Sequence, residues 1–191
     1  YVSLAFAADA NDPEIGKLYG DTSDWLTKIG SELLFFDLEL NRIPDEAMAR
    51  ALLEPKLRRY KPWLDHLRAL KPYQLDDELE RAFHDRAQTA NGAWIRLYDE
   101  TLTALRYDVG GKELTGEEAL HLLSEPERDV RRDAAQALAK TFNANLRLFT
   151  HITNTLAKDK DIEDAWRKFP DATTSRHLGN RVEPEVVEAL A

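Results

Sequence analysis

Residues 143–169 contain neither glycine nor proline, so no residue in this segment is expected to break a helix. Hydrophobic residues recur on one face at helical spacing, namely Phe142, Phe149, Ile152 and Leu156. The next positions on the same face are charged: Lys160, Glu163 and Arg167. A surface helix normally keeps its charges on the opposite side. Two interpretations follow: the helix end leaves the core, or the three charges form an ion cluster that faces another part of a larger protein.

Helical spacing also dominates the first half of the chain. We predict a helix end over residues 1–8, and then a helix that Asp12 caps, that has Pro13 in its first turn and that runs to about residue 40. Gly16 and Gly20 lie four residues apart on this helix, which either allows close helix packing or is ordinary tolerance. Shorter helices are expected at 45–53 and 62–70.

The middle of the chain continues this pattern and then departs from it. A helix over 75–90 has charge pairs four residues apart, such as Asp77 with Arg81, and Asn91-Gly92 should end it before a helix over 93–105. From residue 105 to 114, alternating residues flank Gly110-Gly111, which predicts a β-hairpin with a primed turn.

Capping signals mark the elements that follow the hairpin. Thr115 with Glu118, and Ser124 with Glu127, each match a capping box before a helix. Pro170 should end the 143–169 helix, and Thr173 or Thr174 should cap a short turn. The predicted fold class is therefore all-α, a multi-helix region over 1–191 with one small hairpin near 105–114.

The two ends of the sequence suggest that it is an internal piece of a longer protein. Tyr1 begins an apolar stretch with no polar cap before it, and the helix start at 183–185 has few residues after it. The first residues also lack the basic leader of a signal peptide.

Composition limits the possible partners. The net charge of -9 argues against nucleic acid, because binding phosphates requires a basic face. No apolar run approaches the ~20 residues of a membrane span, and we see no basic amphipathic segment typical of membrane surfaces. Cysteine is absent, which excludes disulfides and Cys-bound zinc within the chain and is compatible with the cytoplasm.

Motifs that carry chemistry are missing. No two of the five histidines lie three to five residues apart, so a zinc site on one helix is excluded. Gly110-Gly111 lacks the pattern of a phosphate-binding loop. The acidic residues at 159–164 alternate with Lys158 and Lys160, so mutual pairing explains them better than a cation site. We therefore assign no catalytic, cofactor-binding or metal-binding residue.

Several segments, in order, resemble the oligoendopeptidase F family of zinc peptidases, which is related to thimet oligopeptidase. The most specific is LAKDKDIEDAWRKFP at 156–170. The others are SELLFFDLEL at 31–40, AWIRLYDE at 93–100, EEALHLL at 117–123 and PERDVRRD at 126–133. The resemblance spans nearly the whole chain, and the order of the segments makes the set more specific than any one of them.

The resemblance implies a helical N-terminal region that forms one wall of a channel for short peptides. In the family, an H-E-x-x-H helix and a later Glu bind the zinc, which activates water and polarises the scissile carbonyl. These residues lie downstream of the matching part and are absent here, so no site residue is carried over. The implied partners are short peptide substrates and the downstream catalytic domain.

Two hypotheses about function remain. The first is the channel-wall lobe of a cytoplasmic zinc oligoendopeptidase, inactive by itself and with zinc only in the parent protein. The second is a stand-alone helical interaction module without catalysis. The order of the matching segments favours the first.

Overall fold

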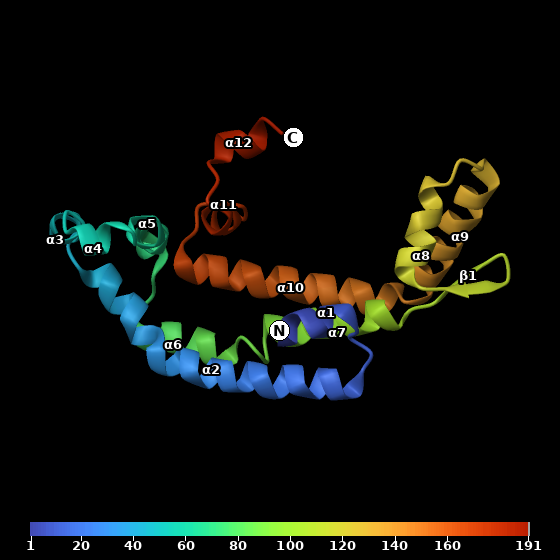
Figure 1. Cartoon of the computed structure of the whole chain (residues 1–191), viewed down its shortest axis with the longest axis horizontal. Coiled ribbons are helices and arrows are strands. Elements are labelled where there is room, and N and C mark those ends of the chain that lie inside the picture. The colour runs from blue at the N-terminus through green and yellow to red at the C-terminus, as the bar shows by residue number, and fades with distance from the viewer. Residues whose placement is uncertain (191) are drawn as a thin grey trace. The chain divides into compact units, whose positions relative to one another are not determined.

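A computed structural model describes residues 1–190 of the chain (Figure 1). The chain divides into two compact units, which we call unit 1 (1–25 with 88–158) and unit 2 (26–87 with 159–191). Two long helices, α2 (Pro13–Arg42) and α10 (Leu146–Arg167), contribute residues to both units. The predicted all-α class with one small hairpin is confirmed.

Unit 1 contains the hairpin and the helices around it. Besides its parts of α2 and α10, its elements are α1 (Val2–Ala8), α7 (Asn91–Ala104), β1 (Tyr107–Val109), β2 (Lys112–Leu114), α8 (Gly116–His121), the 3₁₀ turn η2 (Leu122–Ser124) and α9 (Arg128–Ala144). The strands are antiparallel, and Tyr107 lies opposite Leu114. Gly110 and Gly111 have φ angles of 64° and 84°, which explains why glycine occupies both turn positions.

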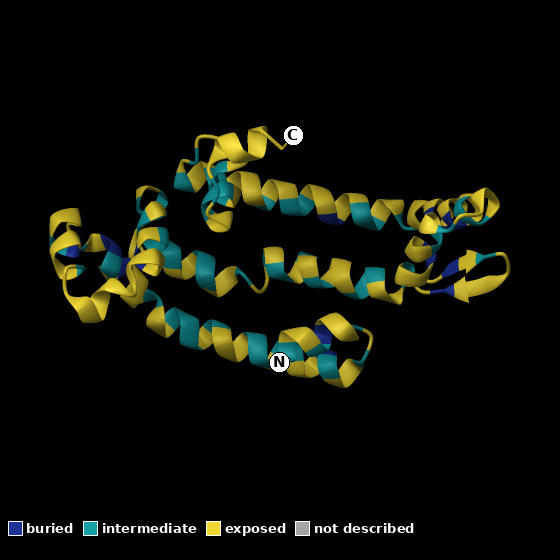
Figure 2. Cartoon of the chain, turned by 45° about the horizontal axis from the view of Figure 1, so that its top comes forward, coloured by how far each residue is buried: buried dark blue, intermediate teal, exposed yellow. Residues whose placement is uncertain are grey.

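The core of unit 1 lies where the hairpin meets α8 and α9 (Figure 2). Tyr107, Ala119 and Leu138 are buried together, with Leu105 packed against them. Thr115 caps α8 through the predicted capping box, since its side chain accepts from the Glu118 amide and the Glu118 side chain accepts from the Thr115 amide. A hairpin too small to be stable alone is thus held on a helical surface.

Gly16 and Gly20 accommodate an arginine from α7. The Arg96 guanidinium donates to the Gly16 carbonyl at 3.1 Å, and a Cβ at Gly20 would lie 3.1 Å from its Nη1. The same guanidinium lies over the stacked rings of Phe6 and Tyr19. Gly20 therefore permits this close approach, as the packing interpretation proposed, whereas a Cβ at Gly16 would lie 3.6 Å from Nη2 in ordinary contact, so Gly16 fits the interpretation of ordinary tolerance.

Unit 2 is built from short helices. Besides its parts of α2 and α10, its elements are α3 (Asp45–Ala51), α4 (Pro55–Arg58), α5 (Lys61–Ala69), the 3₁₀ turn η1 (Lys71–Tyr73), α6 (Asp77–Arg86), α11 (Thr174–Asn180) and α12 (Pro184–Glu188). The α6 helix packs closely on α2, because the His84 Nε2 lies 3.0 Å from the Thr27 carbonyl. This contact requires glycine at position 30, where a Cβ would lie only 2.7 Å from the same nitrogen.

In residues 1–145, four local predictions were wrong. The helix over 143–169 is interrupted at Asn145, whose side-chain amide donates to the Thr141 carbonyl and offers the backbone an alternative to the helix. Asn91-Gly92 does not break a helix but begins α7, because the chain turns at 87–90. The 75–90 helix is correspondingly shorter, and η1 precedes it.

The other two errors concern polar contacts. Ser124 caps nothing: it ends η2, and α9 starts at Arg128 without a side-chain cap. Arg131 instead donates to the backbone carbonyls before α9. Asp77 pairs with Arg42 of α2 rather than with Arg81, since a partner from a neighbouring helix lies closer.

Burial is sparse in both units. Eleven hydrophobic residues of the described chain are buried, whereas 24 large hydrophobic residues are exposed. Figure 2 shows exposed and half-buried positions along most of α2 and α10. None of the described helices is long and apolar enough to cross a membrane.

Candidate functional site

The predicted charge cluster centres on Arg167, in the last turn of α10. Its Nη1 and Nη2 bind both carboxylate oxygens of Glu80 on α6, at 2.7 and 3.1 Å. Its Nε donates to Glu163 at 2.7 Å, and Nη1 also reaches the Tyr73 carbonyl at 3.3 Å. The guanidinium lies 5.6 Å from the ring centroid of Phe83. Each of the three guanidinium nitrogens therefore donates at least one hydrogen bond within unit 2.

Lys160 does not belong to this cluster. One interpretation of the sequence placed Lys160 in one ion cluster with Glu163 and Arg167, but Lys160 instead pairs with Asp164, four residues on, and its Nζ lies 3.1 Å from the Ser175 hydroxyl. The reason is geometric, because residues four apart lie on the same helical ridge and Asp164 occupies that position for Lys160. The three charges therefore belong to two separate groups, Lys160 with Asp164, and Arg167 with Glu80 and Glu163.

Burial and pairing act in opposite directions on Arg167. The Arg167 side chain is 18% exposed and that of Glu80 12%. Burial alone would lower the pKa of Arg167, but its hydrogen bonds with Glu80 and Glu163 outweigh this effect and raise the pKa. Arg167 is charged in any case, so the cluster acts as a fixed cation held between two carboxylates. Glu80 was missed from the sequence because it lies 87 residues from Arg167.

A cavity of about 370 Å³ adjoins this cluster in unit 2. Its wall includes Arg167, Glu80 and Glu163, and also the buried Asn41, whose amide donates to the Gln74 side chain at 2.9 Å. Tyr73 and Phe169, in tilted ring contact at 4.3 Å, close another part of the wall. The charged groups of the cluster bind one another across this wall, so they stabilise the packing of α6 on α10.

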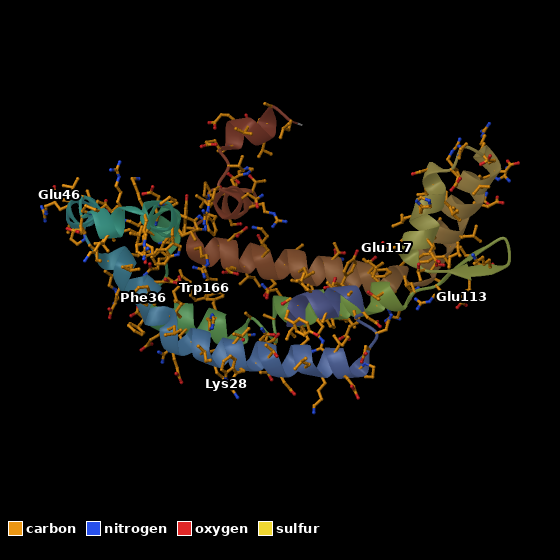
Figure 3. All side chains as sticks on the ribbon, in the orientation of Figure 1. Lys28, Phe36, Glu46, Glu113, Glu117 and Trp166 are labelled. Carbon is orange, nitrogen blue, oxygen red and sulfur yellow. The ribbon has the colours of Figure 1, made fainter. Side chains whose placement is uncertain are left out.

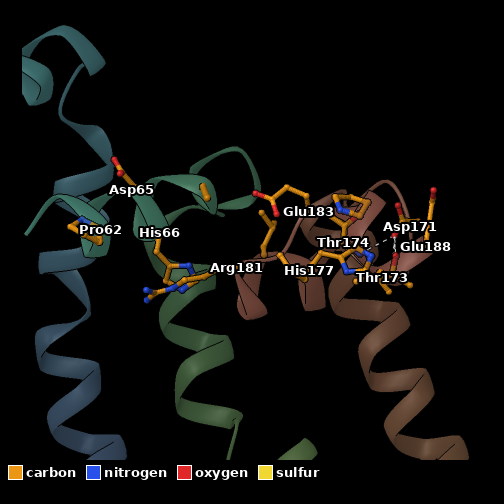
Figure 4. Close-up of a pocket in the computed structure, with 15 residues that line it drawn as sticks. Pro62, Asp65, His66, Asp171, Thr173, Thr174, His177, Arg181, Glu183 and Glu188 are labelled. Atoms are coloured by element: carbon orange, nitrogen blue, oxygen red, sulfur yellow. Dashed lines mark hydrogen bonds between the residues drawn. The ribbon is translucent and has the colours of Figure 1, made fainter. Parts of the chain in front are cut away.

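A larger cavity of about 800 Å³ lies between α5 and the α11–α12 segment (Figure 4). His66, His177 and Arg181 line it, as do several apolar side chains. Neither imidazole forms a hydrogen bond with another group of the described chain, so neither histidine has a partner that would orient it as a base. This cavity has the size of a ligand site without a catalytic arrangement.

Asp171 shapes one edge of the larger cavity. A single carboxylate oxygen accepts from the amides of Thr173 and Thr174 and from the Thr173 hydroxyl, as the dashed lines of Figure 4 show. These hydrogen bonds lower the pKa of Asp171 to about 2. The predicted cap of this helix, Thr173 or Thr174, is therefore a donor to Asp171 and makes no side-chain cap of its own.

No metal site is assembled in the part of the chain that the structure describes, where no three histidine, cysteine or acidic side chains come together to bind an ion. The described residues thus do not fit a zinc ion. Around the two cavities, the hydrogen bonds of residues 1–190 likewise do not link a nucleophile to a base and an orienting group.

Comparison with known proteins identifies the relationship. Residues 39–107 match the family described as Oligopeptidase F. This match confirms the resemblance to the oligoendopeptidase F family that the sequence indicated. No curated protein matches the chain.

A solved structure shares the fold. The crystal structure of oligoendopeptidase-F from Enterococcus faecium superposes on this chain with a TM-score of 0.86 and 19% sequence identity. The match covers 100% of this chain and 39% of the Enterococcus protein, so the chain spans well under half the length of that structure.

Proposed function

We propose, from the match to the oligoendopeptidase F family, that the chain is the N-terminal lobe of a peptidase that cleaves internal bonds of short oligopeptides. In this proposal the helices form a wall of the substrate channel. The catalytic residues and a zinc ion belong to a downstream domain, and the lobe alone is inactive. The parent protein acts in the cytoplasm on short peptides.

The observation that carries this proposal is the fold match over the full length of the chain. A TM-score of 0.86 at 19% identity means that the path of the backbone agrees although most side chains differ. The fold alone does not specify an activity. The family match at 39–107 adds the peptidase relationship to the shared fold.

The exposed surface supports a role as part of a larger assembly. The chain exposes 13900 Å² at a mass of 21.8 kDa. Two separate compact units, each of half this mass, would together expose about 11000 Å². The excess includes large apolar side chains such as Trp25, Leu33 and Phe36, which are all more than half exposed. Surfaces of this kind are usually covered by another domain or by a partner.

Zinc is assigned to the parent protein because the residues described here do not fit it. When bound, zinc would lower the pKa of its water and polarise the scissile carbonyl. None of the residues in this chain is proposed to take part in that step. Their proposed contribution is to enclose the substrate and exclude folded proteins from the channel.

The alternative is a helical interaction module without catalysis, which the same exposed surface would also suit. The coding sequence beyond Ala191 distinguishes the peptidase lobe from the interaction module. The lobe proposal expects an H-E-x-x-H motif on a predicted helix, followed by a further Glu. A stop codon soon after Ala191, or a continuation without the motif, would favour the interaction module.

A further inference from the structure

A basic surface stands out on this acidic protein. Residues 50–63, which we call the basic aromatic surface, contain five of the 26 Lys and Arg residues and one of the 35 Asp and Glu residues. The chain as a whole has a net charge of -9. The surface lies in unit 2 and comprises the end of α3, all of α4 and the start of α5.

Apolar side chains on this surface are open to solvent. Every residue from 53 to 63 is exposed. Leu53 is 80% exposed, and Leu57, Tyr60 and Trp63 are each exposed by about two fifths, at 42%, 42% and 41%. Their spacing of four, three and three residues follows the helical turns of α4 and α5.

The aromatic side chains are held in place before any partner arrives. The Arg59 guanidinium lies 4.7 Å from the centre of the Tyr60 ring and donates to its hydroxyl. Trp63 stacks on Phe36 of α2 at 6.4 Å. Fixed aromatic groups lose little conformational entropy on binding, which favours their use as anchors.

Several cations of the surface remain available. Within residues 1–190, Arg50, Lys56 and Arg58 form no ion pair, whereas Lys61 pairs with Asp65. The free cations flank Leu53 and Leu57 along the chain. A ligand that places carboxylates around an apolar side chain would therefore match both features of the surface.

We infer that the basic aromatic surface docks an acidic polypeptide segment, with its carboxylates on Lys56 and Arg58 and an apolar side chain against Leu53 and Leu57. Arginine, tyrosine and tryptophan are enriched at the centres of protein interfaces. Nucleic acid would not use the exposed leucines, and a bilayer would favour freely inserting aromatic groups over the stacked Trp63. The inference does not depend on the proposed peptidase.

Fluorescence anisotropy with two short labelled peptides tests this docking surface. In the first peptide Glu alternates with Leu and Phe, and in the second Lys replaces every Glu. We expect the chain to bind only the acidic peptide, and more weakly as salt rises. The double variant Lys56→Glu/Arg58→Glu should weaken binding by about tenfold, because two attractive contacts become repulsive. Leu53→Ser should weaken it by about threefold through lost apolar contact.

The matched control is Lys28→Glu/Arg176→Glu, which reverses two exposed cations elsewhere in unit 2; Lys28 is labelled on α2 in Figure 3. Its binding should equal that of the unchanged chain, and circular dichroism should show the same helicity for all variants. Equal losses in both double variants, or equal binding of the two peptides, would overturn the inference. Preferential binding to phosphatidylglycerol vesicles or to an oligonucleotide, without binding to the acidic peptide, would also overturn it.

Discussion

Glu80→Gln is expected to destabilise the chain much more than Glu163→Gln, although both carboxylates bind Arg167. Glu80 binds two guanidinium nitrogens, and its side chain is 12% exposed. Glu163 binds one nitrogen and is 36% exposed. Glu80 also accepts from the Leu75 amide at 2.8 Å, so its replacement disturbs the start of α6 as well.

The magnitude follows from burial. Breaking a fully buried pair costs roughly 3–5 kcal/mol, whereas an exposed pair contributes about 0–1 kcal/mol. Arg167 retains Glu163 when Glu80 is changed, so the loss falls between these limits, at about 2 kcal/mol. Glu163→Gln should cost about 0.5 kcal/mol, as for other partly exposed pairs four residues apart.

Urea unfolding followed by circular dichroism measures the difference. At a typical m-value, a loss of 2 kcal/mol lowers the midpoint by about 1 M urea. Asp65→Asn, which removes the exposed pair with Lys61, is the control and should shift the midpoint little. A double-mutant cycle with Arg167→Met should give a larger coupling energy for Glu80 than for Glu163. Equal and small effects of Glu80→Gln and Glu163→Gln would refute the reasoning, because they would place the cluster among solvated surface charges.

Three further predictions follow from individual contacts. Gly30→Ala should destabilise the chain by about 1–2 kcal/mol, since its Cβ would displace His84. Gly16→Ala should instead raise the free energy of unfolding by about 0.5–1 kcal/mol, because its Cβ would meet only Arg96, at 3.6 Å. Thermal unfolding of both variants checks the opposite signs. Asp171 should titrate near 2 in a carboxyl NMR titration. Because its pKa is lowered from 3.8, its contribution to stability is full above pH 3.8 and is lost as the pH falls toward 2. A midpoint near 3.8 would contradict the hydrogen bonds that Asp171 accepts from Thr173 and Thr174. Gly111→Ala should lower the free energy of unfolding by about 1–2 kcal/mol, because residue 111 has a φ of 84°. Unchanged amide hydrogen exchange in the strands between Tyr107 and Leu114 would contradict this.

Local signals in the sequence predicted much of the fold. Asp12 accepts from the amides of Glu14 and Ile15, as expected of a cap, and Gly110-Gly111 forms the expected turn. Each of these features depends on residues within a few positions of one another. A sequence pattern reports such contacts directly.

The errors arose where distant residues compete with local ones. Asp77 pairs with Arg42 of another helix and not with its predicted partner Arg81. Arg167 binds a second carboxylate, that of Glu80, which lies 87 residues away in the sequence. Nothing in a single sequence identifies such pairs. The basic aromatic surface was missed for another reason, because the chain-wide charge of -9 conceals a local excess of cations at 50–63.

Zinc content and peptide cleavage, measured in parallel on this chain and on the longer peptidase that is proposed to contain it, test the central claim most directly. After dialysis, we expect one tightly bound zinc per longer protein and none in this chain. The longer protein should cleave an internally quenched oligopeptide in a chelator-sensitive manner, and this chain should not cleave it. One zinc bound by this chain with chelator-sensitive cleavage, or a longer protein that neither binds zinc nor cleaves peptides, would contradict the assignment of this chain as the non-catalytic lobe of an oligoendopeptidase.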